Sequence, residues 1–159
     1  MSDSKFQIIK ATTPALYQAG AQLFREYADS LDFALSYQNF DDELLILPVM
    51  YGAPTGALFL VEAGNTFIGA VGLRRIENDF TCEVKRMYIR PGYQGQGIGK
   101  ALMSALIAEA GALGYTTIKL DTLDKMTAAL HLYKSFGFKE TTPYNISPLE
   151  NVLFFEREL

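Results

Sequence analysis

The sequence of 159 residues lacks several features that mark exported, membrane-spanning and nucleic-acid-binding proteins. Its single cysteine, Cys82, excludes an internal disulfide, which favours a reducing interior. No apolar run approaches the roughly 20 residues that a bilayer-spanning helix needs, and residues 1–6 lack the basic start and apolar run of a secretory signal. These absences predict a cytoplasmic protein with no membrane partner.

Neither sign of charge is in large excess. The 14 Lys and Arg residues and 18 Asp and Glu residues give a net charge of −4 at pH 7. Nucleic-acid binding relies on many cationic contacts to phosphates, so we expect no nucleic-acid partner. The 49% of hydrophobic and 20% of charged residues are typical of a chain that folds alone, and the length suits one domain over residues 1–159.

The hydrophobic pattern predicts an α/β fold, of the mixed α+β kind, in which helices cover both faces of one sheet. Thr13 and Pro14 supply the cap and first turn of a helix with apolar residues at helical spacing. Further helices are expected at residues 41–47, 98–113 and 126–136. Strands are expected at residues 6–9, 56–62, 66–76, 80–89, 116–121, 138–140 and 151–158.

The most distinctive segment is the glycine-rich turn at residues 90–100, between an expected strand and an expected helix. Alternate glycines let backbone N–H groups approach an anion, and a helix start adds unpaired donors and roughly half a positive charge. A P-loop does not fit, because Gln94 and Ala101 stand where it requires Gly and Ser or Thr. A dinucleotide fingerprint fails at Lys100 or Leu102, where its third glycine would stand. A phosphate or pyrophosphate of another kind of ligand is expected here.

The spacing Gln94-x-x-Gly97-x-Gly99 resembles the (Arg/Gln)-x-x-Gly-x-(Gly/Ala) element of the GNAT superfamily of N-acetyltransferases. The resemblance extends from residues 67–73 through 83–89 and the glycine turn to residues 129–138. It implies a GNAT-like mixed sheet, acetyl-coenzyme A (acetyl-CoA) as co-substrate, no metal, and a possible homodimer.

The same resemblance implies which residues bind the coenzyme. In the family the turn's amides hold the pyrophosphate, and the pantetheine arm pairs with the preceding strand. The implied pyrophosphate-binding residues are Gln94, Gly95, Gln96, Gly97, Ile98, Gly99 and Lys100. The implied pantetheine-binding residues are Met87, Tyr88 and Ile89. The alternative is a turn that only connects a strand to a helix.

Acetylation of an amine requires its neutral form, which at pH 7 is about 0.04% of an alkyl ammonium, a cost of roughly 4.6 kcal/mol. A proton acceptor is therefore expected, and Glu83 is the candidate because the resemblance places its strand beside the thioester. The alternative is a structural carboxylate that pairs with Lys85 or Arg86.

Tyr133 matches the tyrosine that many GNAT enzymes place near the coenzyme sulfur, where its hydroxyl can stabilise the departing thiolate. The alternative is a core aromatic residue. The sequence departs from the family at Met126, where many members have an asparagine that contacts the coenzyme. Thr122 or Asp124 could replace that contact.

A Cys82–His131 nucleophile and base is not expected, because these positions fit packing and surface roles, and two such residues do not make a metal site. The acceptor is not identified by the sequence. Residues that could line its pocket, or serve as core and solvated charge, are Phe33, Tyr37, Phe40, Asp41, Asp42, Glu43 and Tyr51.

The leading hypothesis is an N-acetyltransferase that passes the acetyl group of acetyl-CoA to a primary amine, of a small molecule or a protein, by direct attack on the thioester. The first alternative is a non-catalytic acyl-CoA sensor or interaction module. The second is a nucleotide-binding module.

Overall fold

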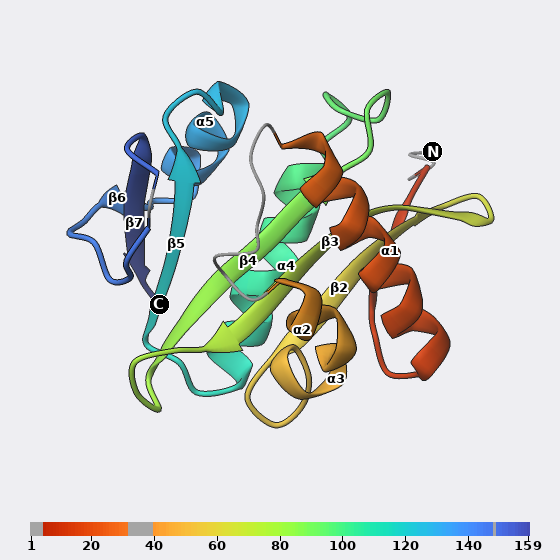
Figure 1. The fold of residues 1–159 in the computed structure, drawn as a ribbon, viewed down its shortest axis with the longest axis horizontal. Coiled ribbons are helices and arrows are strands. Elements are labelled where there is room, and N and C mark those ends of the chain that lie inside the picture. The colour runs from red at the N-terminus through yellow and green to blue at the C-terminus, as the bar shows by residue number, and fades with distance from the viewer. Residues whose placement is uncertain (1–4, 32–39, 148) are drawn as a thin grey trace.

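The computed structural model describes residues 5–31, 40–147 and 149–159, and the strands within these residues form one seven-stranded sheet (Figure 1). The order is β1-β2-β3-β4-β5-β7-β6, and neighbours are antiparallel except for β4 and β5. The strands are β1 (Gln7–Lys10), β2 (Ala57–Ala63), β3 (Thr66–Arg75), β4 (Thr81–Ile89), β5 (Thr117–Leu123), β6 (Lys139–Glu140) and β7 (Val152–Glu158).

Helices cover both faces of this sheet, which confirms the predicted fold class. One face carries α1 (Pro14–Ser30), α2 (Phe40–Leu45) and α3 (Leu47–Met50), and the other carries α4 (Ile98–Ala112) and α5 (Thr127–Ser135). As expected, α1 starts with a capping threonine: the Thr13 hydroxyl accepts a hydrogen bond from the Leu16 N–H (3.3 Å).

Two apolar cores lie on the two faces. On one face, Leu102, Met103 and Leu106 of α4 pack with buried residues of the sheet such as Val71 and Ile118. On the other, Leu23 and Phe24 of α1 pack with Leu58, Leu60 and Tyr51. Burial of these side chains fixes the sheet between its helices.

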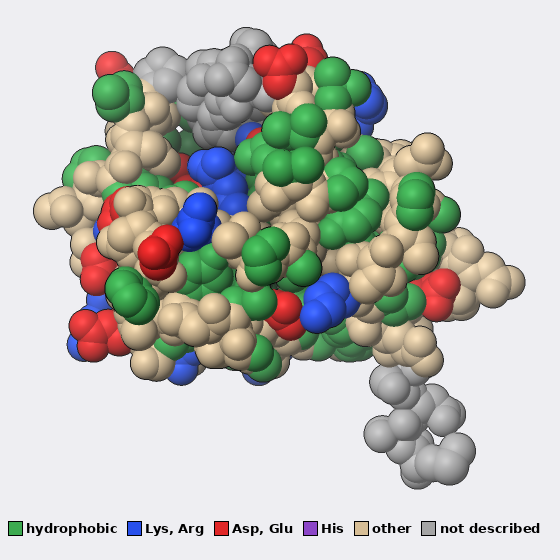
Figure 2. Space-filling view, turned by 90° about the horizontal axis from the view of Figure 1, so that it is seen from below, with side chains coloured by type: hydrophobic (Ala, Val, Ile, Leu, Met, Phe, Trp, Pro, Cys, Tyr) green, Lys and Arg blue, Asp and Glu red, His purple; other side chains and the backbone are tan. Residues whose placement is uncertain are grey.

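The expected helix at residues 41–47 is in fact divided into α2 and α3, because Ile46 leaves the helical conformation (φ −127°, ψ 29°) and Pro48 begins a new first turn. These two short helices expose Leu45 and Val49. Figure 2 shows the molecule from below, the side on which α2 and α3 lie in Figure 1, with hydrophobic side chains among the charged ones. Within the described residues, no helix has both the length and the apolar character to cross a membrane.

The sheet opens between its two parallel strands. β4 and β5 pair only at Thr81–Thr117, Cys82–Ile118 and Glu83–Lys119, and then diverge (Figure 1). Backbone hydrogen-bonding groups of β4 beyond this point therefore face an opening instead of a neighbouring strand, which leaves room for an extended ligand.

A β-bulge interrupts β4 at this opening. The β3–β4 register shifts between Ala70 and Gly72, and Arg86 has a positive φ of 60°, which is uncommon for a residue with a Cβ. Val84 packs on the α4 side and regular alternation would place Arg86 there too. The bulge instead turns Arg86 to the α2 side, the face of the sheet that Lys85 also occupies.

Candidate active site

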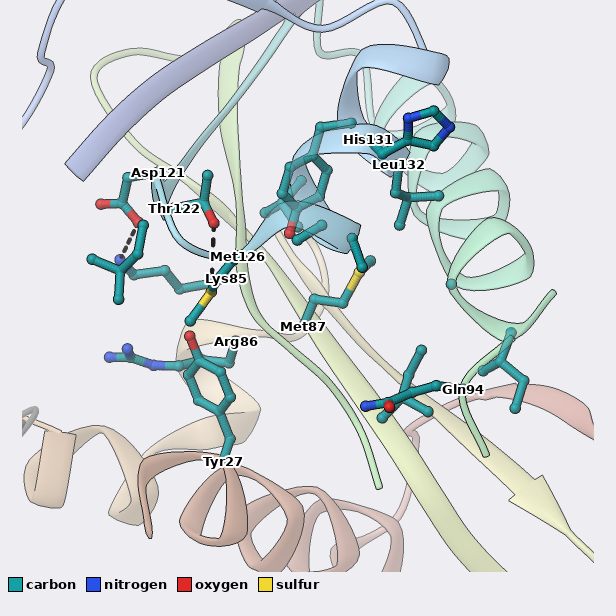
Figure 3. A pocket seen from close by; sticks show the side chains of 18 of the residues that line it. Tyr27, Lys85, Arg86, Met87, Gln94, Asp121, Thr122, Met126, His131 and Leu132 are labelled. Atoms are coloured by element: carbon teal, nitrogen blue, oxygen red, sulfur yellow. Dashed lines mark hydrogen bonds and ion pairs between the residues drawn. The ribbon is translucent and has the colours of Figure 1, made fainter. Parts of the chain in front are cut away.

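The opening between β4 and β5 continues into a cavity of about 720 Å³. Its walls come from β4, the glycine-rich loop, the end of β5, α5 and two residues before β7, Ser147 and Leu149. Figure 3 shows Gln94 toward one end and Lys85 with Asp121 toward the other. One continuous space thus connects the loop with a charged end, which we call the acceptor end.

The glycine-rich loop has the geometry of an anion cradle. Gly95 and Gly97 both line the cavity and have positive φ angles of 79° and 81°, which favour residues without a Cβ. The first hydrogen bond of α4 runs from the Ala101 N–H to the Gly97 carbonyl (3.1 Å), so the preceding amides lie in the unpaired first turn. The loop therefore fits a diphosphate such as that of coenzyme A.

Gly99 serves a different purpose from the two loop glycines. A Cβ on this residue would lie 3.2 Å from Leu132 Cδ2 of α5. The absence of a side chain here lets α4 and α5 approach each other at the edge of the cavity.

Most of the residues expected to bind the coenzyme line this cavity. They are Met87, Ile89, Gln94, Gly95, Gly97, Ile98, Gly99 and Lys100. Tyr88 instead lines an adjoining groove of about 400 Å³ beside α1, and its hydroxyl lies 3.5 Å from Glu26 Oε1. The exposed Gln96 lines neither space.

Tyr133 comes from α5 and lies against the cavity wall. The residue is 6% exposed, and its ring packs edge-on against Phe138 with 6.0 Å between centroids. Within the part of the chain that the structure describes, its hydroxyl makes no hydrogen bond. Burial, with smaller contributions from Tyr27 and Asp121, raises the pKa of the phenol, so it stays protonated at neutral pH and can donate.

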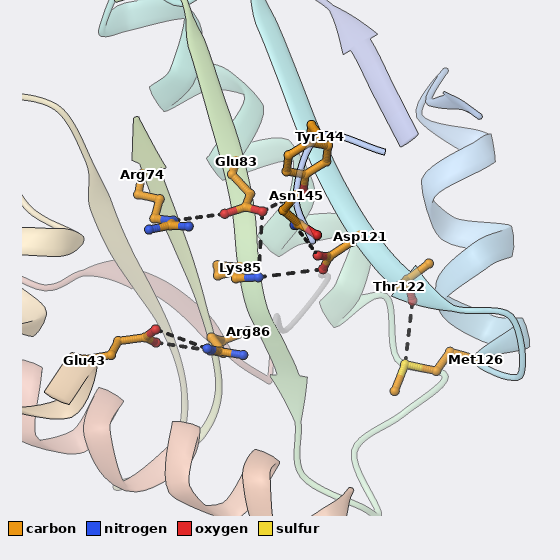
Figure 4. Close-up of polar contacts among 10 residues, drawn as sticks. All are labelled: Glu43, Arg74, Glu83, Lys85, Arg86, Asp121, Thr122, Met126, Tyr144 and Asn145. Carbon is orange, nitrogen blue, oxygen red and sulfur yellow. Dashed lines mark hydrogen bonds and ion pairs between the residues drawn. The ribbon is translucent and has the colours of Figure 1, made fainter. Parts of the chain in front are cut away.

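Glu83 lies behind the cavity wall. It is fully buried and does not line the cavity, and its two oxygens accept hydrogen bonds from Arg74 Nε (2.9 Å) and the Tyr144 hydroxyl (2.6 Å) (Figure 4). Lys85 Nζ is more distant, at 3.7 Å, and Arg86 pairs with a different carboxylate. Of the two partners considered from the sequence, Lys85 forms an ion pair with Glu83 and Arg86 does not, and the hydrogen bonds come from Arg74 and Tyr144 instead.

Asp121 and Lys85 are the charged pair that reaches the cavity, and sequence reasoning did not propose either for the site. Asp121 Oδ1 lies 3.7 Å from Lys85 Nζ, and Asp121 Oδ2 accepts a hydrogen bond from Asn145 Nδ2 (2.9 Å). Asp121 is the last residue of the strand expected at residues 116–121, which is the one signal that could have identified it. Asn145 and Tyr144 lie in an irregular segment, which has no periodicity from which their positions could be predicted.

Met126 makes a weaker polar contact than an asparagine at the same position would make. Met126 precedes α5, and its Sδ accepts a long hydrogen bond from the Thr122 hydroxyl (3.6 Å). Both residues line the cavity, whereas Asp124 does not. Thr122 is therefore the better placed of the two suggested replacements.

The remaining candidates from the sequence are dispersed: His131 lines the cavity, others are buried in the two cores, and two lie outside the described residues. Burial raises the pKa of Cys82 to about 12, so it is a thiol at neutral pH, and His131 is exposed on α5. Phe40 and Tyr51 are buried in the core beside α1. Phe33 and Tyr37 lie outside the described residues.

Among the three acidic candidates of α2, only Glu43 is buried. Its oxygens accept hydrogen bonds from Arg86 Nε and Nη2, both at 3.1 Å, while Asp41 and Asp42 are exposed.

Residues 17–138 match the model of the Acetyltransferase (GNAT) family. The chain belongs to this family. The predicted resemblance is therefore confirmed. Among relatives of this GNAT chain, the "Uncharacterized N-acetyltransferase C1271.07c" of Schizosaccharomyces pombe is 35% identical over 160 residues, which cover 100% of this chain and 98% of the relative.

Two further comparisons add detail. The "N-acetylaspartate synthetase" of Danio rerio is 35% identical over 133 residues, which cover 78% of this chain and 45% of that protein. A crystal structure of a GNAT family acetyltransferase from Elizabethkingia anophelis with acetyl-CoA bound has a TM-score of 0.69 and 24% identity, covering 99% of this chain and 100% of that one. The latter likeness shows a shared fold.

Proposed function

We propose that this chain transfers an acetyl group from acetyl-CoA to a primary amine by direct attack of the amine on the thioester. The observation that carries the proposal is the single cavity that joins the glycine-rich loop, the Tyr133 hydroxyl and the charged pair Lys85–Asp121. Such a cavity suits a reaction that brings a large anionic carrier and a small polar acceptor together.

The cofactor end would hold the coenzyme through its backbone. The amides of residues 94–100 would bind the diphosphate, and the open edge of β4 at residues 87–89 would pair with the pantetheine arm. Bound there, acetyl-CoA supplies the acetyl group as a thioester. The diverging strands support this arrangement, because they leave the β5 side of β4 available.

At the acceptor end, the amine nitrogen would bond to the carbonyl carbon as the carbon–sulfur bond breaks. One amine proton would pass to a carboxylate, and the Tyr133 hydroxyl would donate a hydrogen bond that stabilises the departing thiolate. Asp121 is the carboxylate that lines the cavity, so we propose it as the immediate proton acceptor. Glu83, which lies behind the cavity wall, would stabilise the charge of Lys85 and accept the hydrogen bond of the Tyr144 hydroxyl.

The direct test is release of free thiol from acetyl-CoA across a panel of amines, with the acetylated product identified by mass. Aspartate belongs in the panel because one relative is named for N-acetylaspartate. Turnover with at least one amine is expected. Tight acetyl-CoA binding without turnover would instead indicate a sensor, and stabilisation by ATP or a nicotinamide cofactor alone would indicate a nucleotide-binding module.

A further inference from the structure

We infer that the acceptor is an α-amino acid and that Lys85 binds its carboxylate. The inference rests on the proposed function and names the class of acceptor for the same cavity. It is carried by Lys85, which lines the acceptor end and, among the described residues, has two ion pairs but no side-chain hydrogen bond, and by Arg86 beside it.

Lys85 is buried and lines the cavity, yet its ammonium group is incompletely paired. The side chain is 9% exposed, and Nζ lies 3.7 Å from both Glu83 Oε2 and Asp121 Oδ1. These separations exceed hydrogen-bond distance, and among the described residues Lys85 donates no side-chain hydrogen bond. Hydrogen bonding stabilises a buried ammonium, so an anionic acceptor in the cavity would add to the two ion pairs of Lys85.

Arg86 adds a second cation on the same face. Its Nε and Nη2 both donate to Glu43 (3.1 Å each), and its guanidinium lies 5.2 Å from the centre of the Phe40 ring (Figure 4). These contacts hold the guanidinium in place. Its Nη1 makes no hydrogen bond within residues 5–31, 40–147 and 149–159, and Arg86 lines the cavity beside Lys85. The left-handed bulge is what brings two consecutive cations to one face.

Asp121 supplies the opposite charge at the same place. Its carboxylate lies 3.7 Å from Lys85 Nζ, so an anion site and a cation site stand side by side in the wall (Figure 3). An α-amino acid has an amine and a carboxylate on one carbon, and this arrangement complements both groups. A polyamine would instead bring a second cation next to Lys85 and Arg86, where like charges repel.

The experiment compares each α-amino acid with its own α-carboxamide, which keeps the amine and the side chain but lacks the anion. We expect kcat/KM to favour the acid at least tenfold in the unchanged protein. In Lys85→Met, which keeps the length of the side chain, the ratio of acid to amide should fall to near one. Lys139→Met, on the exposed strand β6, should keep the original ratio.

Three outcomes would overturn the inference. The first is equal turnover of acids and amides by the unchanged protein, and the second is a preference that survives Lys85→Met; both leave the proposed function standing. The third uses calorimetry on protein saturated with coenzyme A, a measurement that needs no turnover. If the unchanged protein binds amino acids and Lys85→Met does not, the inference is supported. If the unchanged protein binds no amino acid, or Lys85→Met binds them equally well, the inference is overturned. No turnover of any amine would overturn the proposed function itself.

Discussion

The two ends of the cavity recognise charge by different means. At the cofactor end, one continuous stretch, residues 94–100, presents backbone N–H groups at the start of α4. At the acceptor end, charged side chains come from β4 and β5, and their partners come from α2, β3 and residues 144–145. The cofactor end depends on the conformation of the backbone. The acceptor end depends on which side chains tertiary packing brings together.

This difference has a consequence for mutation. A change of side chain in the loop alters coenzyme binding only if it alters the backbone, whereas a change of one charge at the acceptor end leaves partners unpaired in a buried network.

The largest effect is expected when the two acceptor-end carboxylates are neutralised one at a time. Asp121→Asn should lower kcat by roughly a hundredfold, because it removes the carboxylate that we propose as the proton acceptor. Glu83→Gln should lower kcat less than about tenfold while destabilising the fold by about 2 kcal/mol, because Arg74 loses a buried charged partner. Steady-state kinetics and urea unfolding measure both quantities. An equal loss of kcat in well-folded Glu83→Gln would instead identify Glu83 as the proton acceptor.

The second effect concerns the hydroxyl of Tyr133. Tyr133→Phe should lower kcat by roughly tenfold or more, with the Kd of acetyl-CoA unchanged, because in the proposed reaction the hydroxyl stabilises the leaving sulfur. Tyr115→Phe is the matched control, since its hydroxyl donates to the Thr55 carbonyl away from the cavity. That variant should lose about 1 kcal/mol of stability and keep its kcat. If the two variants have similar kcat values, Tyr133 serves only as a core aromatic residue and has no role in the reaction.

A third pair tests the backbone cradle. Gly92 and Gly97 both have positive φ, 95° and 81°, and an added Cβ would meet no atom within 4 Å at either. Alanine at either position therefore introduces similar backbone strain, but only Gly97 lines the cavity. Gly97→Ala should weaken acetyl-CoA binding about tenfold by calorimetry, and Gly92→Ala should leave it unchanged. Equal affinities would show that the loop does not hold the diphosphate.

The contrast between the two ends also explains which parts of the site could be predicted from the sequence. The cradle is local, so the spacing of Gln94, Gly97 and Gly99 was enough to predict a phosphate-binding turn before a helix, and the fold followed from periodicity. Strand alternation placed Glu83 and Lys85 on one face but did not distinguish which of them reaches the cavity. Which of the two reaches the cavity depends on Tyr144, a residue distant in the sequence whose hydroxyl donates a hydrogen bond to Glu83.

Arg86 shows a second limit of sequence reasoning. Its left-handed conformation puts it next to Lys85 on the face toward α2, yet an arginine gives no hint of positive φ as a glycine would. The acceptor end is thus a product of tertiary packing, and it was not predictable from local pattern.

The smallest effect is expected at the ion pair that ties α1 to the start of the loop. Arg90 Nε and Nη2 donate to the two oxygens of Glu26 (2.8 and 2.6 Å), and this hydrogen bonding lowers the pKa of Glu26 against the opposing effect of burial. A lowered pKa in the folded state stabilises the protein above the ordinary pKa of glutamate, and that stabilisation is lost as pH falls through the lowered pKa. Glu26→Gln should therefore cost about 0.5–1 kcal/mol at pH 7 and nothing once the pH is well below that value.

Urea unfolding of Glu26→Gln and of the exposed control Glu140→Gln, across that range of pH, measures the difference. Glu140→Gln should match the unchanged protein throughout. A cost for Glu26→Gln that persists in acid would mean that Glu26 acts by packing and not by charge. In that case the charges of Glu26 and Arg90 would contribute nothing to holding α1 against the start of the loop.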